Sequence, residues 1–186
     1  MSEIMLSLVP LVLVVLLSFQ VFPVALGISG KESLKNTVFP IVILALSQTV
    51  LFLAGYYLGG KFMYLLRGYT STVLFIGFFI IGIRMFMEAF KIRKGERTYE
   101  LNDQRKVLLA ATAQAVNTFL AGLLLYFIPL NIVTVTALLF AASLVMAVGG
   151  VVVVPGKQSL SFASLLYLIS GILIIVSSVY FIFAAF

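Results

Sequence analysis

Two side-chain amides, each inside a long apolar segment, are the residues of this chain most suited to a chemical role. Gln20 lies in the first apolar segment and Asn117 in the fourth. Each is followed two residues later by a phenylalanine, Phe22 or Phe119. An amide buried in hydrocarbon without a hydrogen-bonding partner costs on the order of 1–3 kcal/mol or more. Two amides at matching places in the two halves of the chain therefore predict a shared polar site inside a membrane protein.

Further polar side chains fall inside the apolar segments. Such a group is a candidate for binding a substrate or an ion when it faces the interior of a helix bundle. The candidates are Gln20, Ser47, Gln48, Gln114, Asn117, Thr118 and Ser143. Among them the amides Gln20, Gln48 and Asn117 are the candidate metal ligands. The alternative is that these groups only hold helices together, since polar side chains also hydrogen-bond across helices for about 0.6 kcal/mol each.

Pro23 adds a main-chain group to the candidate site. Proline has no N–H, so the carbonyl four residues earlier, that of Phe19, loses its partner in a continuous helix. We therefore expect the Phe19 carbonyl to lie free beside the Gln20 amide. These two oxygens would form a ligand pair for a cation or a polar solute.

Arg84 and Glu88 form a second candidate group on the third apolar segment. Their i, i+4 spacing places them on one helix face, where they can form an ion pair. They lie near the polar stretch 91–106, toward which an arginine side chain can extend. Two interpretations stay open: an anchoring ion pair at the membrane edge, or a gate on the cytoplasmic side.

Composition identifies the class of protein. Of the 186 residues, 63% are hydrophobic and only 10% are charged, with a mean hydropathy of +1.24. Soluble domains have roughly 45–50% apolar and about 25% charged residues. The chain is therefore predicted to be an all-α integral membrane protein, a single domain over 1–186 with six spans of about 20 residues each. The predicted spans are 4–27, 37–58, 70–90, 107–128, a fifth that ends near 154, and 160–186.

Several function classes are excluded by what the sequence lacks. It contains neither cysteine nor histidine, so disulfides, thiol redox chemistry and thiolate metal sites are ruled out, and the commonest transition-metal ligand is missing. We find no phosphate-binding loop, nucleophile–base set or cofactor motif, so we expect neither an enzyme nor a cofactor. The net charge of +6 comes from basic residues clustered in loops, which favours membrane topology over nucleic-acid binding. The first apolar segment is expected to be a retained span, not a signal peptide.

The basic residues also predict the orientation. The stretch 91–106 holds six of them and is predicted to be cytoplasmic by the positive-inside rule. Alternation then places Lys31, Lys35 and Lys157 inside and only Lys61 and Arg67 outside. Both termini are expected on the outer side of the cell inner (plasma) membrane.

Six spans divide into three plus three, and an odd number of spans in each half predicts two repeats of opposite orientation. Repeat 1 would cover about 1–90 and repeat 2 about 107–186, joined by the loop 91–106. The second spans support this division. Gln48 precedes Gly55 by seven residues, just as Ser143 precedes Gly150.

With these motifs the chain resembles the MntP-type manganese efflux pumps, small six-span proteins of the lysine-exporter-like superfamily. The stretch 18–22 (Ser-Phe-Gln-Val-Phe) is similar to the family's first-span Ser-x-Asp-Ala-Phe pattern, and 47–49 (Ser-Gln-Thr) resembles its second-span Glu-Thr motif. The most specific likeness is 82–90, which holds Gly-x-Arg-Met followed by Glu-x-Phe. The motif 117–119 falls where the family repeats its Asp-Ala motif, and 131–150 follows the fifth span without a gap.

The resemblance implies export of manganese or another divalent cation, but it also implies acidic residues that this chain lacks. Gln20, Gln48 and Asn117 stand where the family pattern has aspartate, glutamate and aspartate. Amide oxygens can ligate Mn²⁺ but supply no charge and do not titrate. Two alternatives therefore stay open beside metal export: a non-transporting membrane subunit of a larger complex, and an exporter of a small polar solute. The expected partners are the lipid bilayer, Mn²⁺ or another cation or small polar solute, and a protein partner or further copies of the chain.

Overall fold

The computed structural model describes residues 3–28, 34–96 and 104–183, and these residues are almost entirely helical. The helices are α1 (Glu3–Ser18), α2 (Val21–Ala25), α3 (Leu34–Phe62), the 3-10 helix η1 (Met63–Tyr69), α4 (Thr70–Arg93), α5 (Gln104–Gln114), α6 (Val116–Leu125), α7 (Ile132–Val152) and α8 (Lys157–Phe183). They provide six segments long and apolar enough to cross a membrane. The predicted helical fold and its six spans are thus confirmed.

The boundaries differ from the prediction in two ways. The second span is longer than expected, because α3 continues to Phe62 and η1 then leads directly into α4. The first and fourth spans each consist of two helices, α1 with α2 and α5 with α6. The expected turn at 29–33, with Lys31, and residues 97–103 of the loop 91–106 lie outside the described residues.

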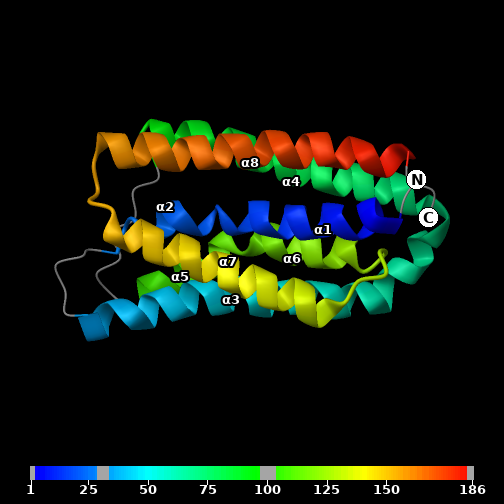
Figure 1. The fold of residues 1–186 in the computed structure, drawn as a ribbon, viewed down its shortest axis with the longest axis horizontal. Coiled ribbons are helices and arrows are strands. Elements are labelled where there is room, and N and C mark those ends of the chain that lie inside the picture. Colours follow the sequence, from blue (N-terminus) through cyan, green and yellow to red (C-terminus); the bar gives the residue numbers. More distant parts are fainter. Residues whose placement is uncertain (1–2, 29–33, 97–103, 184–186) are drawn as a thin grey trace.

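The links between spans alternate between the two ends of the bundle (Figure 1). The start of α1, the 3-10 helix η1, the α6–α7 link and the end of α8 lie at one end. At the other end α2, α4 and α7 finish and α3, α5 and α8 begin. We call this second end the basic end, because it carries the exposed residues Lys91, Arg93, Lys94, Arg105, Lys106 and Lys157.

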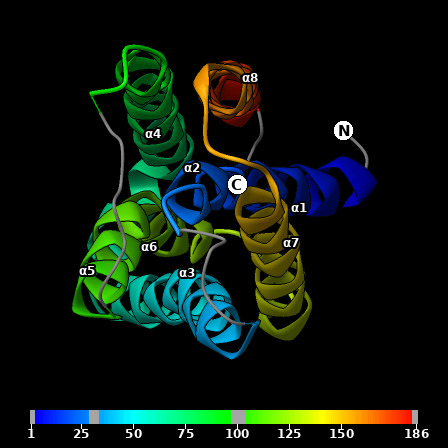
Figure 2. The same cartoon turned by 90° about the vertical axis from the view of Figure 1, so that its left-hand side faces the viewer.

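Helices α1 and α2 run through the middle of the bundle, with α4, α8, α7, α3 and α5–α6 arranged around them (Figure 2). They form the most enclosed span, with 67% of the Leu8–Ala25 window buried. The core around them is built from large apolar side chains such as Leu13, Leu17, Phe52 and Phe78. The middle of the bundle is therefore where a polar side chain would be best shielded from lipid.

Glycines allow three pairs of spans to meet backbone to backbone. A Cβ atom added to Gly55 on α3 would lie 2.1 Å from the carbonyl oxygen of Phe119 on α6, and one on Gly122 would lie 2.2 Å from that of Phe52. A Cβ atom on Gly150 of α7 would lie 2.6 Å from the Phe22 carbonyl oxygen. Small residues of this kind let membrane helices approach closely.

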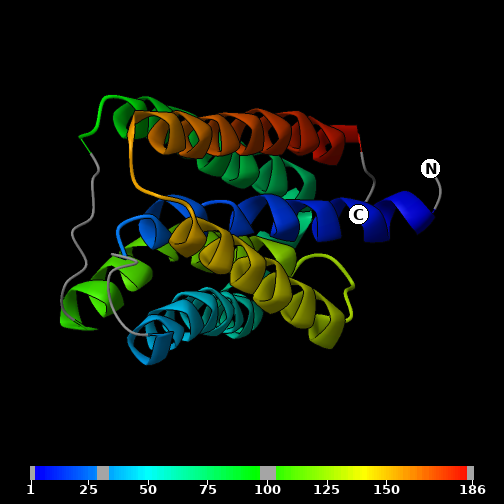
Figure 3. The same cartoon turned by 60° about the vertical axis from the view of Figure 1, so that its left-hand side comes forward.

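The third pair is α4 and α8, which run side by side over α1 and α2 (Figure 3). A Cβ atom on Gly82 would lie 2.9 Å from the carbonyl oxygen of Gly171, and one on Gly171 would lie 2.9 Å from that of Gly82. The contact is thus reciprocal.

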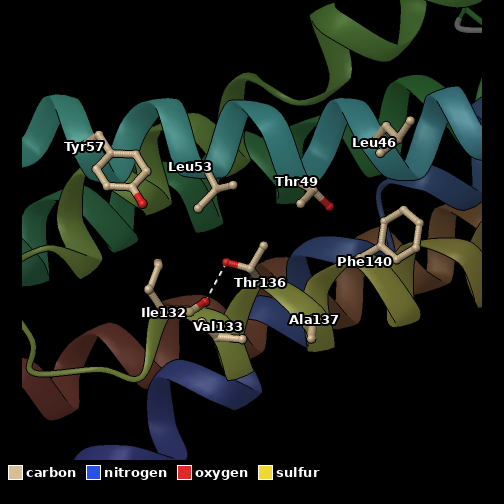
Figure 4. Close-up of a pocket in the computed structure, with 9 residues that line it drawn as sticks. All are labelled: Leu46, Thr49, Leu53, Tyr57, Ile132, Val133, Thr136, Ala137 and Phe140. Carbon is tan, nitrogen blue, oxygen red and sulfur yellow. Dashed lines mark hydrogen bonds between the residues drawn. The ribbon is translucent and has the colours of Figure 1, made fainter.

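Helices α3 and α7 leave an open groove of about 550 Å³ between them (Figure 4). It is lined by Leu46, Thr49, Leu53, Tyr57, Ile132, Val133, Thr136, Ala137 and Phe140. The two threonine hydroxyls in it donate to their own helices, Thr49 to the Ala45 carbonyl at 3.0 Å and Thr136 to the Ile132 carbonyl at 2.6 Å. The groove therefore presents an apolar surface.

The substitution Gly55→Ala tests the α3–α6 contact. The added methyl group has no room beside the Phe119 carbonyl, so we expect a loss of about 1–3 kcal/mol in stability and a lower thermal unfolding midpoint of the purified protein in detergent. Gly68→Ala is the matched control, because nothing lies within 4 Å of its Cβ position. Equal midpoints for the two variants would contradict the close packing.

Candidate functional site

Both spans that carry the predicted amides are interrupted near the site. Phe19 and Gln20 separate α1 from α2, and Ala115 alone separates α5 from α6. Pro23 accounts for the first interruption, because it cannot supply the N–H that a continuous helix needs. The second interruption has neither a proline nor a glycine beside it, so the sequence carried no signal for it.

The expectation of a free Phe19 carbonyl is wrong. The main-chain N–H of Phe22 donates to it, with an N···O distance of 3.3 Å. In the same way Phe19 N–H donates to Leu16 O at 3.3 Å and Gln20 N–H to Leu17 O at 3.4 Å. The chain tightens into i→i+3 bonds at the end of α1, which satisfies carbonyls that an α-helix would leave open.

Gln20 is the centre of a buried hydrogen-bond network. Its Nε2 donates to Gln48 Oε1 at 2.8 Å and to Thr118 Oγ1 at 2.6 Å. Asn117 Nδ2 donates to Gln20 Oε1 at 3.2 Å, and the Thr118 hydroxyl donates to Gln48 Oε1. All four side chains are at most 5% exposed. We call these four residues the amide cluster.

The amide cluster joins three spans at mid-depth. Gln48 is the middle residue of the 29-residue α3, so it lies about 21 Å from either end of that helix at 1.5 Å per residue. Gln20 stands in the break of the first span, and Asn117 and Thr118 lie in the first turn of α6. The three amides that the sequence predicts as candidate ligands therefore converge on one place in the middle of the bundle.

The amide cluster keeps two polar atoms unused. Gln48 Nε2 and Asn117 Oδ1 are buried and have no hydrogen-bond partner within the described part of the chain. One end of the network thus offers a donor and the other an acceptor. Turning all three amides by 180° would preserve every hydrogen bond and exchange the two ends. In either arrangement one amide oxygen is available to a cation or to a donor group.

A second set of hydrogen bonds lies beside the amide cluster and includes a residue that the sequence did not single out. Gln114 Nε2 donates to the main-chain carbonyl of Gln20 and to the Tyr167 hydroxyl. The Tyr167 hydroxyl in turn donates to the Gln20 carbonyl at 3.4 Å. Tyr167 is only 4% exposed on α8. The only feature of the sequence that could have indicated its role was a phenol hydroxyl inside an apolar segment.

Two other predicted residues lie apart from this network. The Ser47 hydroxyl donates to the Ile43 carbonyl of its own helix at 2.8 Å. Ser143 is fully buried on α7, and its hydroxyl has no hydrogen-bond partner among residues 3–28, 34–96 and 104–183.

Glu88 forms an ion pair with Lys91 and not, as had been expected, with Arg84. Lys91 Nζ lies 3.2 Å from Glu88 Oε1, near the end of α4. Arg84 is exposed and lies outside this ion pair. Over the described ranges there is no group of three or more His, Cys, Asp or Glu residues that could hold a metal ion. The oxygen atoms of the amide cluster are all neutral.

Comparison with known proteins gives one finding. Residues 31–182 match the model of the Mntp family, which is described as "Putative manganese efflux pump". The matched range includes Gln48, Asn117 and Thr118, whereas Gln20 precedes it. No curated protein and no solved structure matches the chain.

Removal of one hydroxyl tests the hydrogen bonds of the amide cluster. Thr118→Val keeps the side-chain shape but removes a partner of both Gln20 and Gln48, so we expect a loss of about 1–3 kcal/mol. Thr112→Val is the matched control, because that exposed hydroxyl donates only to Leu108 O of its own helix; its effect should stay within about 0.5 kcal/mol. Unfolding midpoints in detergent give the comparison, and equal shifts would argue against a stabilising network.

Proposed function

Because this chain belongs to the Mntp family of manganese efflux pumps, we propose that it exports Mn²⁺ or another small cation through the amide cluster. The family is one of transporters and not of enzymes, and the chain is a multi-pass membrane protein with six candidate spans. The observation that carries the proposal is the convergence of Gln20, Gln48 and Asn117 on one buried network. This convergence supports one shared site over separate contacts between pairs of helices.

We further propose that the spans form one domain of two inverted repeats. The two interrupted spans are the first of each half, and broken helices at mid-membrane are common at the binding sites of transporters built from such repeats. The glycine contacts support the same pairing. Gly55 of the first half packs on the Phe119 carbonyl of the second, and Gly150 of the second half packs on the Phe22 carbonyl of the first. Each of these phenylalanines follows the amide by two residues.

The proposed orientation places the basic end on the cytoplasmic side of the membrane. Six exposed basic residues gather there, whereas Lys61 lies at the end of α3 on the opposite side. The positive-inside rule favours this arrangement, which puts the start of α1 and the end of α8 outside. The membrane would be the plasma (inner) membrane, and export would run from the basic end outward.

The amide cluster sets limits on how such export works. Amide oxygens coordinate Mn²⁺ but do not offset the cost of removing its water. We therefore expect weaker binding than a carboxylate site gives. None of the four residues in the amide cluster titrates, so protonation of the cluster cannot drive export.

Metal tolerance tests the proposal directly. In a bacterial host that lacks its own manganese exporter, expression of the chain should restore growth at high Mn²⁺ and lower the cellular manganese content. Gln48→Leu should abolish both effects, because it removes two hydrogen bonds and the available polar atom of α3. Gln158→Leu makes the same change at an exposed position of α8 and should act like the wild type. Unchanged tolerance and content across a panel of metal ions would refute cation export.

Restoring the family's charges gives a second test. The double substitution Gln20→Asp with Asn117→Asp should favour divalent cations and raise Mn²⁺ transport relative to the wild type, because carboxylates are preferred Mn²⁺ ligands. It should also introduce a dependence on pH, since carboxylates titrate. Transport into proteoliposomes, followed for Mn²⁺, Mg²⁺, Ca²⁺ and Zn²⁺ at several pH values, would measure both. Gln158→Glu controls for added surface charge, and identical ion profiles would count against the site.

A second candidate function is a membrane subunit that does not transport. The observation in its favour is that the amide cluster satisfies most of its own hydrogen bonds and carries no charge. In that case Gln20→Ala and Asn117→Ala should leave metal tolerance unchanged. A stable complex with a partner protein should then survive mild detergent.

A further inference from the structure

We propose that Gln114 and Tyr167 form a gate that closes the amide cluster toward the basic end of the bundle. The inference rests on the proposed transport function. Neither residue belongs to the amide cluster, and both bind the main-chain carbonyl of Gln20, which stands in the break between α1 and α2. The three groups come from the first, fourth and sixth spans.

The depth of the two side chains places them between the amide cluster and the basic end. Gln114 is the last residue of α5 and precedes Asn117 by three residues, about one helical turn nearer the basic end. Tyr167 is ten residues from the start of α8, or about 15 Å from the basic end at 1.5 Å per residue. A solute moving from that end toward Asn117 meets these side chains first.

Both side chains are buried, which is what a closed gate requires. Gln114 is 7% exposed and Tyr167 is 4% exposed. The single Gln114 Nε2 atom donates to two acceptors, the Gln20 carbonyl and the Tyr167 hydroxyl. Because the Tyr167 hydroxyl also donates to the Gln20 carbonyl, the three groups form a closed triangle.

The location at the helix breaks explains how the gate would open. Gln114 stands where α5 has stopped, so movement of α5 can occur there without breaking a regular helix. Helix α8, by contrast, is held to α4 by the Gly82–Gly171 backbone contact, and α2 is held to α7 by the Gly150–Phe22 contact. Tyr167 and the Gln20 carbonyl therefore serve as the fixed side of the gate, and α5 with Gln114 is its moving side.

Cysteine labelling tests the gate without relying on transport, because the chain contains no cysteine. Ala115→Cys places a reporter in the buried break between Gln114 and α6, and Ala121→Cys places a buried control on the far side of the amide cluster. A membrane-impermeant maleimide is added to vesicles of each orientation. Labelling of the exposed position Gln158→Cys identifies the side of the basic end.

Tyr167→Phe removes only the hydroxyl and should raise the labelling rate of the Ala115→Cys reporter from the basic end by about two- to tenfold. The hydroxyl takes part in two hydrogen bonds of the closed state, and because the one to the Gln20 carbonyl is long at 3.4 Å, the expected change in open population takes the two together as about one good hydrogen bond. Gln114→Leu should have the same effect, and both variants should leave the Ala121→Cys control unchanged. Tyr180→Phe, on the same helix, should change neither rate.

The possible results separate the gate from the transport function. Unchanged labelling in both Tyr167→Phe and Gln114→Leu, with monodisperse protein, would overturn the gate even if Mn²⁺ transport is observed. Faster labelling of the Ala115→Cys reporter without any transport would retain the gate and refute the proposed transport. Faster labelling of both reporters would also overturn the gate, because it would indicate general loosening of the bundle.

Discussion

The structure depends on one constraint, that polar atoms inside hydrocarbon must find partners within the chain. The amide of Gln20 meets this constraint by bonding to Gln48, Thr118 and Asn117 at once. To do so it has to stand in a break of the central span, with α3 and α6 brought against it. The close α3–α6 contact at Gly55 and Gly122 allows this approach. The glycines that allow close packing thus also support the approach of the polar side chains to one another.

Much of this arrangement could be predicted because it follows from chemistry that is visible one residue at a time. Apolar length predicts six spans, and an amide in an apolar segment predicts a buried polar site. The structure brings Gln20, Gln48 and Asn117 together, whereas their role in binding a substrate stays a prediction. The prediction that these side chains meet inside the bundle rested only on their residue type and their position in the apolar segments.

What could not be predicted depends partly on contacts between distant segments and partly on a choice between local alternatives. The sequence around Ala115 contains no proline or glycine that would indicate a break in the helix. Tyr167 cannot be distinguished, by sequence alone, from any other aromatic residue in an apolar helix. The Phe19 carbonyl was expected to be free because Pro23 removes its usual partner, but the chain tightened locally and Phe22 took that place. Glu88 pairs with Lys91 at 3.2 Å, although the spacing of Arg84 would equally have allowed an ion pair.

The reversible direction of the amide cluster has a consequence for a passing charge. A carboxylate site carries a fixed negative charge. Three linked amides instead form a small dipole, which can point in either direction with the same number of hydrogen bonds. A cation near Gln48 favours one direction, and a cation near Asn117 favours the other. In the cation export that we propose, the site would respond to the ion's position as a polarisable medium does, without holding a net charge of its own.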